Sequence, residues 1–539
     1  MGFDVVFAGG PVFTGDPARP WATAVGIKDG TIAAVGHDEV ASAEAAERVG
    51  LGGRMLLPGF QDAHAHPVAA GLQILTCDLR GADTAEGYVQ LVAEYARRFP
   101  EREWIVGGGW SMDRFPPSGP TRRLLDAVVA DRPVFLLNRD AHGAWANTRA
   151  LELAGIGADT PDPADGRIER EPDGAPAGML HEGAATLVGR HTPGRTPEEK
   201  DAALLVAQER LHSLGITAWQ DAIIGEYLDI PDVYDTYLRA AARGTLTARV
   251  SGALWWDRNR GLEQLGDLLA RRVAAGNFTA RTVKIMQDGV AENYTAAMHD
   301  PYFDACGCRT ANSGISFVDP AVLGEAVTAL DAAGFQVHLH AIGDRAATEA
   351  LDALAAARRA NGTTDHRHHI AHLQVIAPGD LPRFRELGVT ANMQALWACH
   401  EPQMDDLTIP FIGPERTARQ YPFAALHRTG ATLAAGSDWP VSSPDPWEGL
   451  HVAVNRVEPG GDHARPLLPE QSLSLHTALT AYTAGSAYVN HLDDTGVIRP
   501  GFRADLAIAD RDPFAAPVEE IHLTRTVATY VGGREVFTA

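Results

Sequence analysis

The feature that most constrains this fold is a short β-rich run, generally followed by a helical pattern, that recurs along most of the chain. Strands that alternate with helices are typical of βα units and a parallel sheet. We count eight such runs, at residues 55–66, 215–222, 247–254, 282–289, 336–343, 368–374, 389–396 and 432–440. Eight units favour a closed barrel over an open sheet, so the predicted class is α/β with a (β/α)8 TIM barrel.

Both ends of the chain have a different pattern, in which apolar and polar positions alternate around turn signals. Residues 1–55 and 496–539 share this character and are expected to pair as one small β-sandwich domain, which leaves residues 56–495 as the barrel. Residues 67–194 form a long insertion after the first strand, with strand-like runs of its own. An insertion at that end of a barrel is expected to act as a lid or a substrate wall.

Charge and cysteine content exclude several kinds of partner. Among 539 residues, 46 Lys and Arg face 69 Asp and Glu, a net charge of −23 that repels a phosphate backbone or an anionic membrane. We therefore expect neither nucleic acid nor membrane as a partner. Four cysteines are too few for a disulfide scaffold, and Cys306 and Cys308 are expected to be unpaired loop thiols. Without a signal peptide or a long apolar run the expected location is the cytoplasm, and a homodimer is compatible with the length.

Polar residues stand where predicted strands end. His64 and His66 are two apart and point to one face, as two ligands of one metal must, although an isolated HxH pair is weak evidence. Four further residues fall near the carboxyl-terminal half of a predicted strand: Lys284 within the fourth strand, and His340, His372 and Asp438 at the ends of the fifth, sixth and eighth. That end of a barrel holds the active site, and each residue would otherwise be a costly buried polar group. His338 shares the strand parity of His340 and is the alternative ligand in that strand.

Seven motifs carry a family likeness: LPGFQDAHAH, VKIMQDG, VHLHAIGDRA, IAHLQVI and AAGSDWPV in the barrel, with RDAHGAWANTRAL and GMLHEGA in the insertion. Together they resemble the amidohydrolase superfamily, and within it the YtcJ-like group that includes N-substituted formamide deformylases. The likeness spans nearly the whole chain. It implies that His64, His66 and Asp438 bind one metal and that His340 and His372 bind a second. Lys284, carboxylated on its amine, would bridge the two.

The resemblance also extends to the insertion. His142 matches a family position, with a role either in substrate binding or transition-state polarisation or in a structural hydrogen bond, and we retain it with Asp438 as a catalytic candidate. For Glu182 a structural role is favoured. Asp344 and Arg345 are expected to orient the loop after His340.

The function implied is that of a metal-dependent hydrolase, which cleaves a non-peptide C–N bond of a small amide, N-formyl or N-acyl substrate through metal-activated hydroxide. Asp438 would act first as general base and then as acid. One or two zinc ions are expected, although iron and manganese accept the same ligands. The alternatives are a mononuclear deaminase, a cyclic amide or ester hydrolase, and a non-catalytic scaffold. Four tryptophans beside these motifs indicate either an apolar pocket or core packing: Trp110, Trp145, Trp397 and Trp439.

Overall fold

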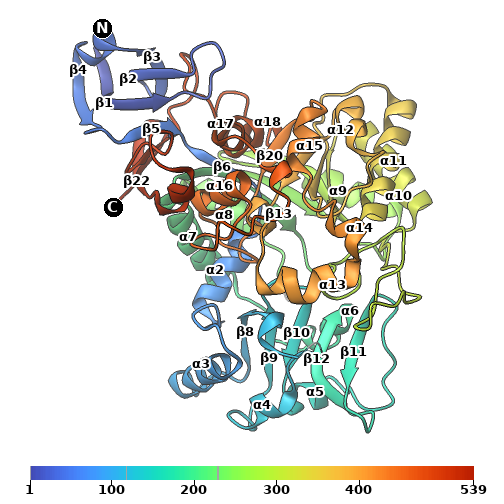
Figure 1. Ribbon diagram of the computed structural model, residues 1–539. Helices are drawn as coiled ribbons and strands as arrows, with labels where there is room; N and C mark the ends of the chain where they lie inside the picture. The colour runs from blue at the N-terminus through green and yellow to red at the C-terminus, as the bar shows by residue number, and fades with distance from the viewer. Residues whose placement is uncertain (1, 117, 228–229) are drawn as a thin grey trace.

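A barrel of parallel strands forms the centre of the computed structural model, which describes residues 2–116, 118–227 and 230–539 (Figure 1). Its strands follow one another around the barrel in chain order, and each of the eight runs identified in the sequence overlaps one of them. They are β6 (Phe60–Ala65), β13 (Ile216–Ile224), β14 (Arg249–Trp255), β16 (Phe278–Met286), β17 (Gln336–Ala341), β18 (His369–His372), β19 (Thr390–Met393) and β20 (Leu433–Ala435). The predicted TIM barrel is confirmed.

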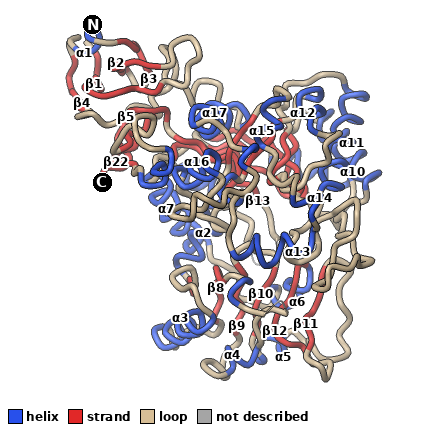
Figure 2. The backbone as a smooth tube through the Cα atoms, viewed as in Figure 1, coloured by secondary structure: helices blue, strands red, loops and turns tan. Residues whose placement is uncertain are grey.

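Helices cover the outside of the barrel, as the colouring by secondary structure shows (Figure 2). The main ones are α7 (Pro197–Ser213), α8 (Tyr234–Arg243), α9 (Leu265–Arg271), α10 (Pro320–Ala332), α11 (Asp344–Asn361), α12 (Leu381–Leu387), α15 (Phe423–Arg428) and α16 (Pro446–Asn455). Helix α10 starts where the Asp319 side chain accepts hydrogen bonds from the first free backbone N–H groups, with Pro320 in the first turn. In the described residues, no helix has both the length and the apolar composition needed for a membrane span.

Alternation along the barrel strands decides which side chains face the interior. On β16, Val283 and Ile285 pack into the apolar cluster between strands and helices. Lys284 lies between them in the sequence and therefore points to the other face, where it lines a cavity. On β17, Val337 and Leu339 pack outward in the same way. The sequence alternation thus directs polar side chains into the barrel interior.

Strands from both ends of the chain form one eight-stranded sheet beside the barrel, in the order β23-β22-β21-β5-β1-β2-β3 with β4 paired to β1. Its strands are β1 (Phe3–Phe13), β2 (Trp21–Lys28), β3 (Thr31–Gly36), β4 (Ala45–Gly50), β5 (Met55–Pro58), β21 (Leu506–Ala509), β22 (Thr526–Val531) and β23 (Arg534–Thr538). Strand β5 pairs antiparallel with β21. The small sheet therefore reaches Pro58, beyond the boundary expected at residue 55, and the barrel strand begins at Phe60.

The long insertion folds around a six-stranded sheet of its own, which lies on the opposite side of the barrel from the terminal sheet (Figure 1). Helix α2 (Pro67–Leu75) leads into β7 (Cys77–Asp78), β8 (Ile105–Trp110), β9 (Val134–Asn138), β10 (Gly143–Ala146), β11 (Gly166–Arg170) and β12 (Pro176–Glu182). Helices α3 (Ala85–Arg98), α4 (Arg122–Asp126), α5 (Thr148–Leu153) and α6 (Gly183–Gly189) accompany this sheet. Trp110 and Trp145 are packed in the core of this insertion, so they contribute to its packing and not to an aromatic substrate pocket.

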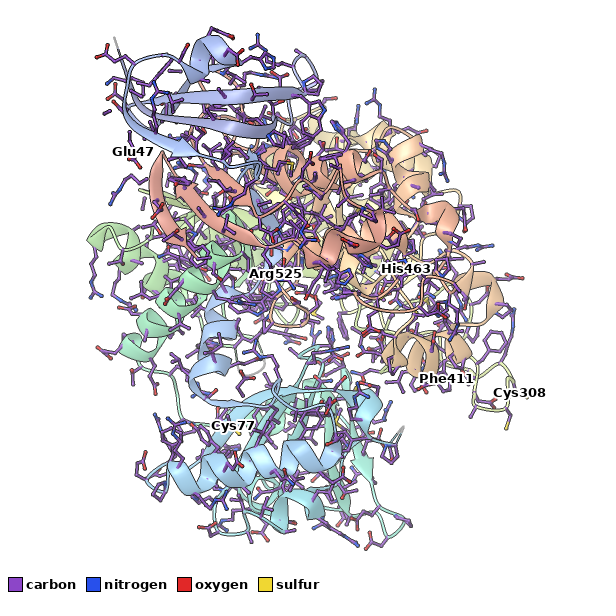
Figure 3. The ribbon with its side chains drawn as sticks, turned by 60° about the vertical axis from the view of Figure 1, so that its left-hand side comes forward. Glu47, Cys77, Cys308, Phe411, His463 and Arg525 are labelled. Carbon is purple, nitrogen blue, oxygen red and sulfur yellow. The ribbon has the colours of Figure 1, made fainter. Side chains whose placement is uncertain are left out.

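All four cysteines are free thiols. Cys77 is buried in the insertion domain, whereas Cys308 lies at the outer end of a loop on the far side of the molecule (Figure 3). The fold is therefore held by packing and hydrogen bonds without disulfides.

A buried ion pair joins the barrel to the terminal sheet. Arg249 at the start of β14 donates to Asp505 at 2.6 and 3.0 Å, and Asp505 also accepts from the backbone N–H of Gly532 at 2.7 Å. The side chains are 10% and 1% exposed. Because both charges have left water, the loss of either partner leaves the other without compensation.

We expect Asp505→Ala to lower the free energy of unfolding by about 3–5 kcal/mol, since Arg249 would remain buried and unpaired. Urea unfolding followed by tryptophan fluorescence measures this loss. The double variant Arg249→Met with Asp505→Leu should recover most of the stability. Asp494→Ala, which breaks an exposed pair with Arg503, is the matched control and should cost less than about 1 kcal/mol. Equal losses in the buried and exposed variants would contradict this account.

Candidate active site

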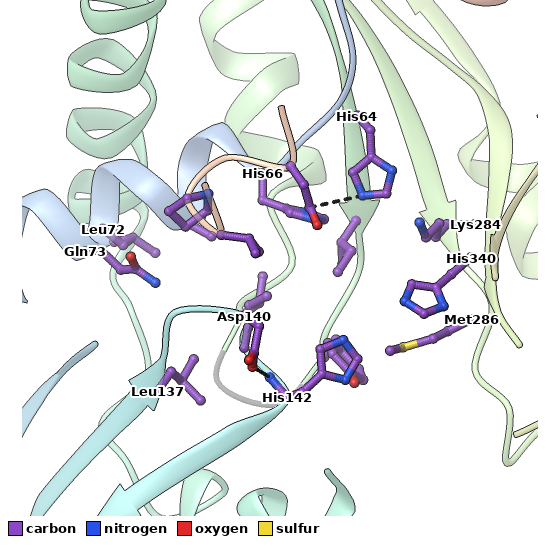
Figure 4. Close-up of a pocket in the computed structure, with 18 of the residues that line it drawn as sticks. His64, His66, Leu72, Gln73, Leu137, Asp140, His142, Lys284, Met286 and His340 are labelled. Atoms are coloured by element: carbon purple, nitrogen blue, oxygen red, sulfur yellow. Dashed lines mark hydrogen bonds and ion pairs between the residues drawn. The ribbon is translucent and has the colours of Figure 1, made fainter. Parts of the chain in front are cut away.

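The site is organised around one carboxylate oxygen at the mouth of the barrel. Oδ1 of Asp438 lies 3.2 Å from Nε2 of His64 and 3.0 Å from Nε2 of His66 (Figure 4). Burial and the nearby Lys284 lower the pKa of His64 to about 3, so its ring is neutral. Burial acts to raise the pKa of Asp438, but the two imidazoles outweigh it and hold that pKa well below its usual range. An ionised carboxylate therefore faces the neutral ring of His64.

Asp62 fixes these residues by joining the first and last strands of the barrel. Its Oδ1 accepts hydrogen bonds from the backbone N–H groups of His64 and Ser437, both at 3.0 Å, and its Oδ2 accepts from the Ser437 hydroxyl at 2.5 Å. The Asp438 N–H donates to the His64 carbonyl at 2.7 Å. Gly436 is required at this junction, because a Cβ there would lie 2.7 Å from the backbone nitrogen of His64.

His340 and His372 stand on the neighbouring strands β17 and β18, with ring centres 4.5 Å apart. Nδ1 of His340 lies 3.0 Å from Oδ1 of Asp288, which leaves Nε2 available to the cavity. Asp288 is in turn held by the backbone N–H groups of three residues, Ala297, Ile342 and Gly343. His372 packs its ring parallel to Trp397 at 5.2 Å. One ligand atom each from His64, His372 and Asp438 lie within 4.8 Å of one another.

Lys284 is buried between these groups without a carboxylate partner among the described ion pairs. Its Nζ lies 3.3 Å from Nε2 of His338, the alternative ligand on β17, which in turn lies 3.0 Å from Nδ1 of His64. Burial lowers the pKa of Lys284 to about 7. The acidic residues that might have paired with it are engaged elsewhere: Asp288 with backbone N–H groups, and Glu292 with the Thr408 hydroxyl.

Backbone strain is concentrated at the same place. His372, Asp438 and Glu182 have φ angles of 76°, 56° and 51°, a region that side chains with a Cβ rarely adopt. Such residues cost on the order of 1–3 kcal/mol each and persist only where the surrounding structure enforces them. The surrounding structure therefore holds His372, Asp438 and Glu182 in conformations that lower the free energy of unfolding.

The insertion domain contributes His142 to the opposite side of the cavity (Figure 4). Nδ1 of His142 lies 3.0 Å from both carboxylate oxygens of Glu182, and Thr295 from the loop after β16 donates to Glu182 at 2.8 Å. Burial acts to lower the pKa of His142, but Glu182 outweighs it and raises the pKa to about 9. A cationic imidazole thus faces the barrel, with its ring centre 5.9 Å from that of His340.

Comparison with known proteins places this geometry in a family. The model of the amidohydrolase family matches residues 47–537. The chain belongs to the amidohydrolase family. It is 32% identical to Protein LONG AFTER FAR-RED 3 of Arabidopsis thaliana, over 99% of this chain and 91% of that protein. It is 27% identical to the N-substituted formamide deformylase of Arthrobacter pascens, over 98% and 97%.

A solved structure shares the whole architecture of this amidohydrolase. It is an uncharacterised metal-dependent hydrolase from Pyrococcus horikoshii OT3, which has 26% sequence identity and a TM-score of 0.74 and aligns over 95% of this chain and 99% of its own. The family resemblance drawn from the seven motifs is confirmed, and the protein is a metal-dependent hydrolase.

The donor atoms of this amidohydrolase suit a divalent cation. Nδ1 of both His66 and His372 is buried without a hydrogen-bond partner in the described structure. Buried polar atoms normally find a partner, and imidazole with carboxylate is the donor set that zinc, iron and manganese accept. The residues present therefore fit a metal.

Sequence reasoning missed three residues of the site. Asp62 and Asp288 stand two and four residues from a candidate ligand, inside motifs already noted, so their spacing was an available signal. Tyr227 also lines the cavity, but its loop carries no recognisable pattern. Of the four tryptophans noted in the sequence, Trp397 lines this cavity. Asp344 contacts the backbone of His299 and not a candidate ligand, so Asp288 is the residue that orients His340.

We expect His64→Ala and His66→Ala each to release at least one metal ion per chain, because a site with few protein ligands rarely keeps its ion after losing one. Elemental analysis of dialysed protein measures the metal content. His427→Ala, at an exposed helical position, is the control and should keep the metal content of the unmodified protein. Unchanged metal in either site variant would remove that histidine from the ligand set.

Proposed function

We propose that this amidohydrolase cleaves the C–N bond of small N-formyl or N-acyl amides. The observation that carries the proposal is the buried Asp438 carboxylate, which lies within 3.2 Å of imidazole nitrogens of His64 and His66 and opens to a largely apolar cavity. An ionised carboxylate beside a metal site can take a proton from water and return it to a leaving nitrogen. The deformylase relative from Arthrobacter pascens, by its name, acts on N-substituted formamides.

The proposed ligands are His64, His66 and Asp438 for one metal, with His340 and His372 for a second, and zinc is the favoured ion. When bound, a divalent cation lowers the pKa of water towards ~7 and polarises a carbonyl oxygen. The protein supplies the remaining functions. The ionised Asp438 receives the proton of water, and the cationic His142 faces the place where negative charge develops on the carbonyl oxygen.

We further propose that Lys284 is carboxylated. A lysine with its pKa lowered to about 7 has a large neutral fraction at neutral pH. The amine lone pair would form the N–C bond to CO2, and one N–H proton would pass to solvent, which gives a carbamate anion. Its two oxygens could bind one metal each. An uncarboxylated ammonium beside two divalent ions would be repelled.

A one-metal enzyme is the second candidate, as in a deaminase or a hydrolase of cyclic amides. One observation favours it: His64, His372 and Asp438 each have a ligand atom within 4.8 Å of the other two, close enough for all three to bind one ion. In that case Lys284 would not need to be carboxylated. Metal stoichiometry distinguishes the two proposals.

We expect Asp438→Asn to reduce turnover of an N-formyl or N-acyl amide by about 10²–10⁴-fold, because the amide side chain cannot accept the proton of water. The assay is amine release by the metal-reconstituted enzyme over a panel of N-formyl, N-acyl and cyclic amides. Asp494→Asn, at the protein surface, should retain full activity. Hydrolysis of cyclic amides alone would contradict the proposed substrate class, and near-normal turnover by Asp438→Asn would exclude Asp438 as the base.

We expect reconstitution of metal-free enzyme to depend on bicarbonate, since the carbamate must form before it can bridge. Lys284→Ala should lose one metal ion and regain part of its activity with a short carboxylic acid, which replaces the missing oxygens. Metal per chain and amine release are measured with and without bicarbonate. If reconstitution ignores bicarbonate and Lys284→Ala still holds two ions, the bridge is absent and the one-metal candidate is favoured.

A further inference from the structure

Tyr227 presents an unpaired hydroxyl to the active-site cavity. The residue lines that cavity, and its Oη is buried without a hydrogen-bond partner in the described structure. Burial raises the pKa of Tyr227, so the phenol stays protonated and able to donate. A buried donor left unpaired costs roughly 1–3 kcal/mol, and such groups in native proteins call for an explanation.

The chain holds this ring in position from two sides. After the end of β13, the backbones of Tyr227 and Ile230 exchange hydrogen bonds at 3.1 and 2.8 Å. The Tyr227 ring packs on Trp255 at the end of β14, with ring centres 4.8 Å apart. Gly225 lets the turn approach, because a Cβ there would lie 2.5 Å from Cβ of Trp255. These contacts place the Tyr227 side chain at the cavity.

The charged groups around the hydroxyl are already occupied. Among charged residues, Glu182 has the largest effect on the pKa of Tyr227. Both Glu182 oxygens contact His142, and one accepts a hydrogen bond from Thr295. Arg258 has the second largest effect, and it forms an ion pair with Asp165. Neither group forms a hydrogen bond with Tyr227. The Tyr227 hydroxyl is therefore available to a substrate atom or to water in the cavity.

Much of the lining of this cavity is apolar, although His142, Arg195 and Lys284 also reach it. Leu72 and Leu137 come from the insertion, and Met286, Trp255 and Trp397 come from the barrel. A substrate group that fills this space gains by leaving water, at about 25 cal/mol for each Å² of apolar surface. The wall therefore favours an apolar or aromatic substituent, with one position at which a hydrogen-bond acceptor is needed.

We propose that Tyr227 and Trp255 form a specificity subsite for the nitrogen substituent of the amide, in which the Tyr227 hydroxyl donates to an acceptor atom on an otherwise apolar, ring-sized group. This inference rests on the proposed amide hydrolysis and names its substrate class more closely. Trp255 supplies the flat surface against which the ring packs. A site built to donate one hydrogen bond discriminates strongly against the analogue that lacks the acceptor.

The test compares N-(arylmethyl)formamides that differ in a single ring atom: phenyl, 2-pyridyl, 3-pyridyl and 4-pyridyl. The metal-reconstituted full-length enzyme is assayed for kcat/KM, with Tyr227→Phe as the variant. We expect one pyridyl isomer to exceed the phenyl substrate with the native tyrosine. In Tyr227→Phe that ratio should fall roughly 10-fold or more, while the phenyl substrate keeps its kcat/KM within about 3-fold. Tyr95→Phe, in the insertion helix α3, is the control and should leave the ratio unchanged.

Two results would overturn the subsite. One is an equal loss for phenyl and pyridyl substrates in Tyr227→Phe, which indicates a structural role. The other is an unchanged ratio, which indicates that the hydroxyl only holds water. If the native enzyme hydrolyses none of the four formamides, the proposed reaction fails. Calorimetric binding of the same four compounds to the metal-loaded native and Tyr227→Phe enzymes then gives a readout without turnover, and the pyridyl-to-phenyl affinity ratio of the two proteins still decides the subsite.

Discussion

The closure of the barrel by Asp62 is the constraint on which the site depends. Its carboxylate accepts hydrogen bonds from residues 64 and 437, which are separated by most of the barrel sequence. Because the backbone of His64 also accepts from Asp438, the HxH pair and the last-strand aspartate are fixed relative to one another before any ligand binds. Burial raises the pKa of Asp62 to about 6, against the hydrogen bonds that favour its ionised form. The enzyme thus keeps a costly buried carboxylate in order to position a second one.

Burial then sets the charge state of several candidate donors. The imidazoles of His64 and His372, removed from water, become neutral, which is the form that binds metal, while Asp438 stays ionised because imidazoles face it. The same burial lowers the pKa of Lys284. Loss of its proton makes the amine nucleophilic. One physical effect therefore prepares the ligands and the lysine together. The strained φ angles at His372 and Asp438 are compatible with this preorganisation.

The insertion completes what the barrel alone lacks. The insertion supplies both the cation at His142 and part of the apolar surface of the cavity around the candidate metal ligands. Glu182 and Asn293 join the two parts: Glu182 accepts from Thr295 of the barrel, and Asn293 of the barrel donates to the His142 carbonyl at 3.0 Å. These hydrogen bonds join the barrel to the insertion at the cavity, which residues of both parts line.

By itself, the sequence determined the barrel, its eight strands and the residues at their carboxyl ends, because strand periodicity places alternate side chains on opposite faces and those signals are local. It also indicated that Lys284 faces inward, since Val283 and Ile285 had to pack against helices. Only the tertiary structure decided which residues support the candidate ligands and what fills the rest of the cavity. Asp288 contacts His340 across 52 positions, and Tyr227 meets Trp255 across two strands. Such pairings depend on how strands close and loops return, and no periodic pattern in the chain records them.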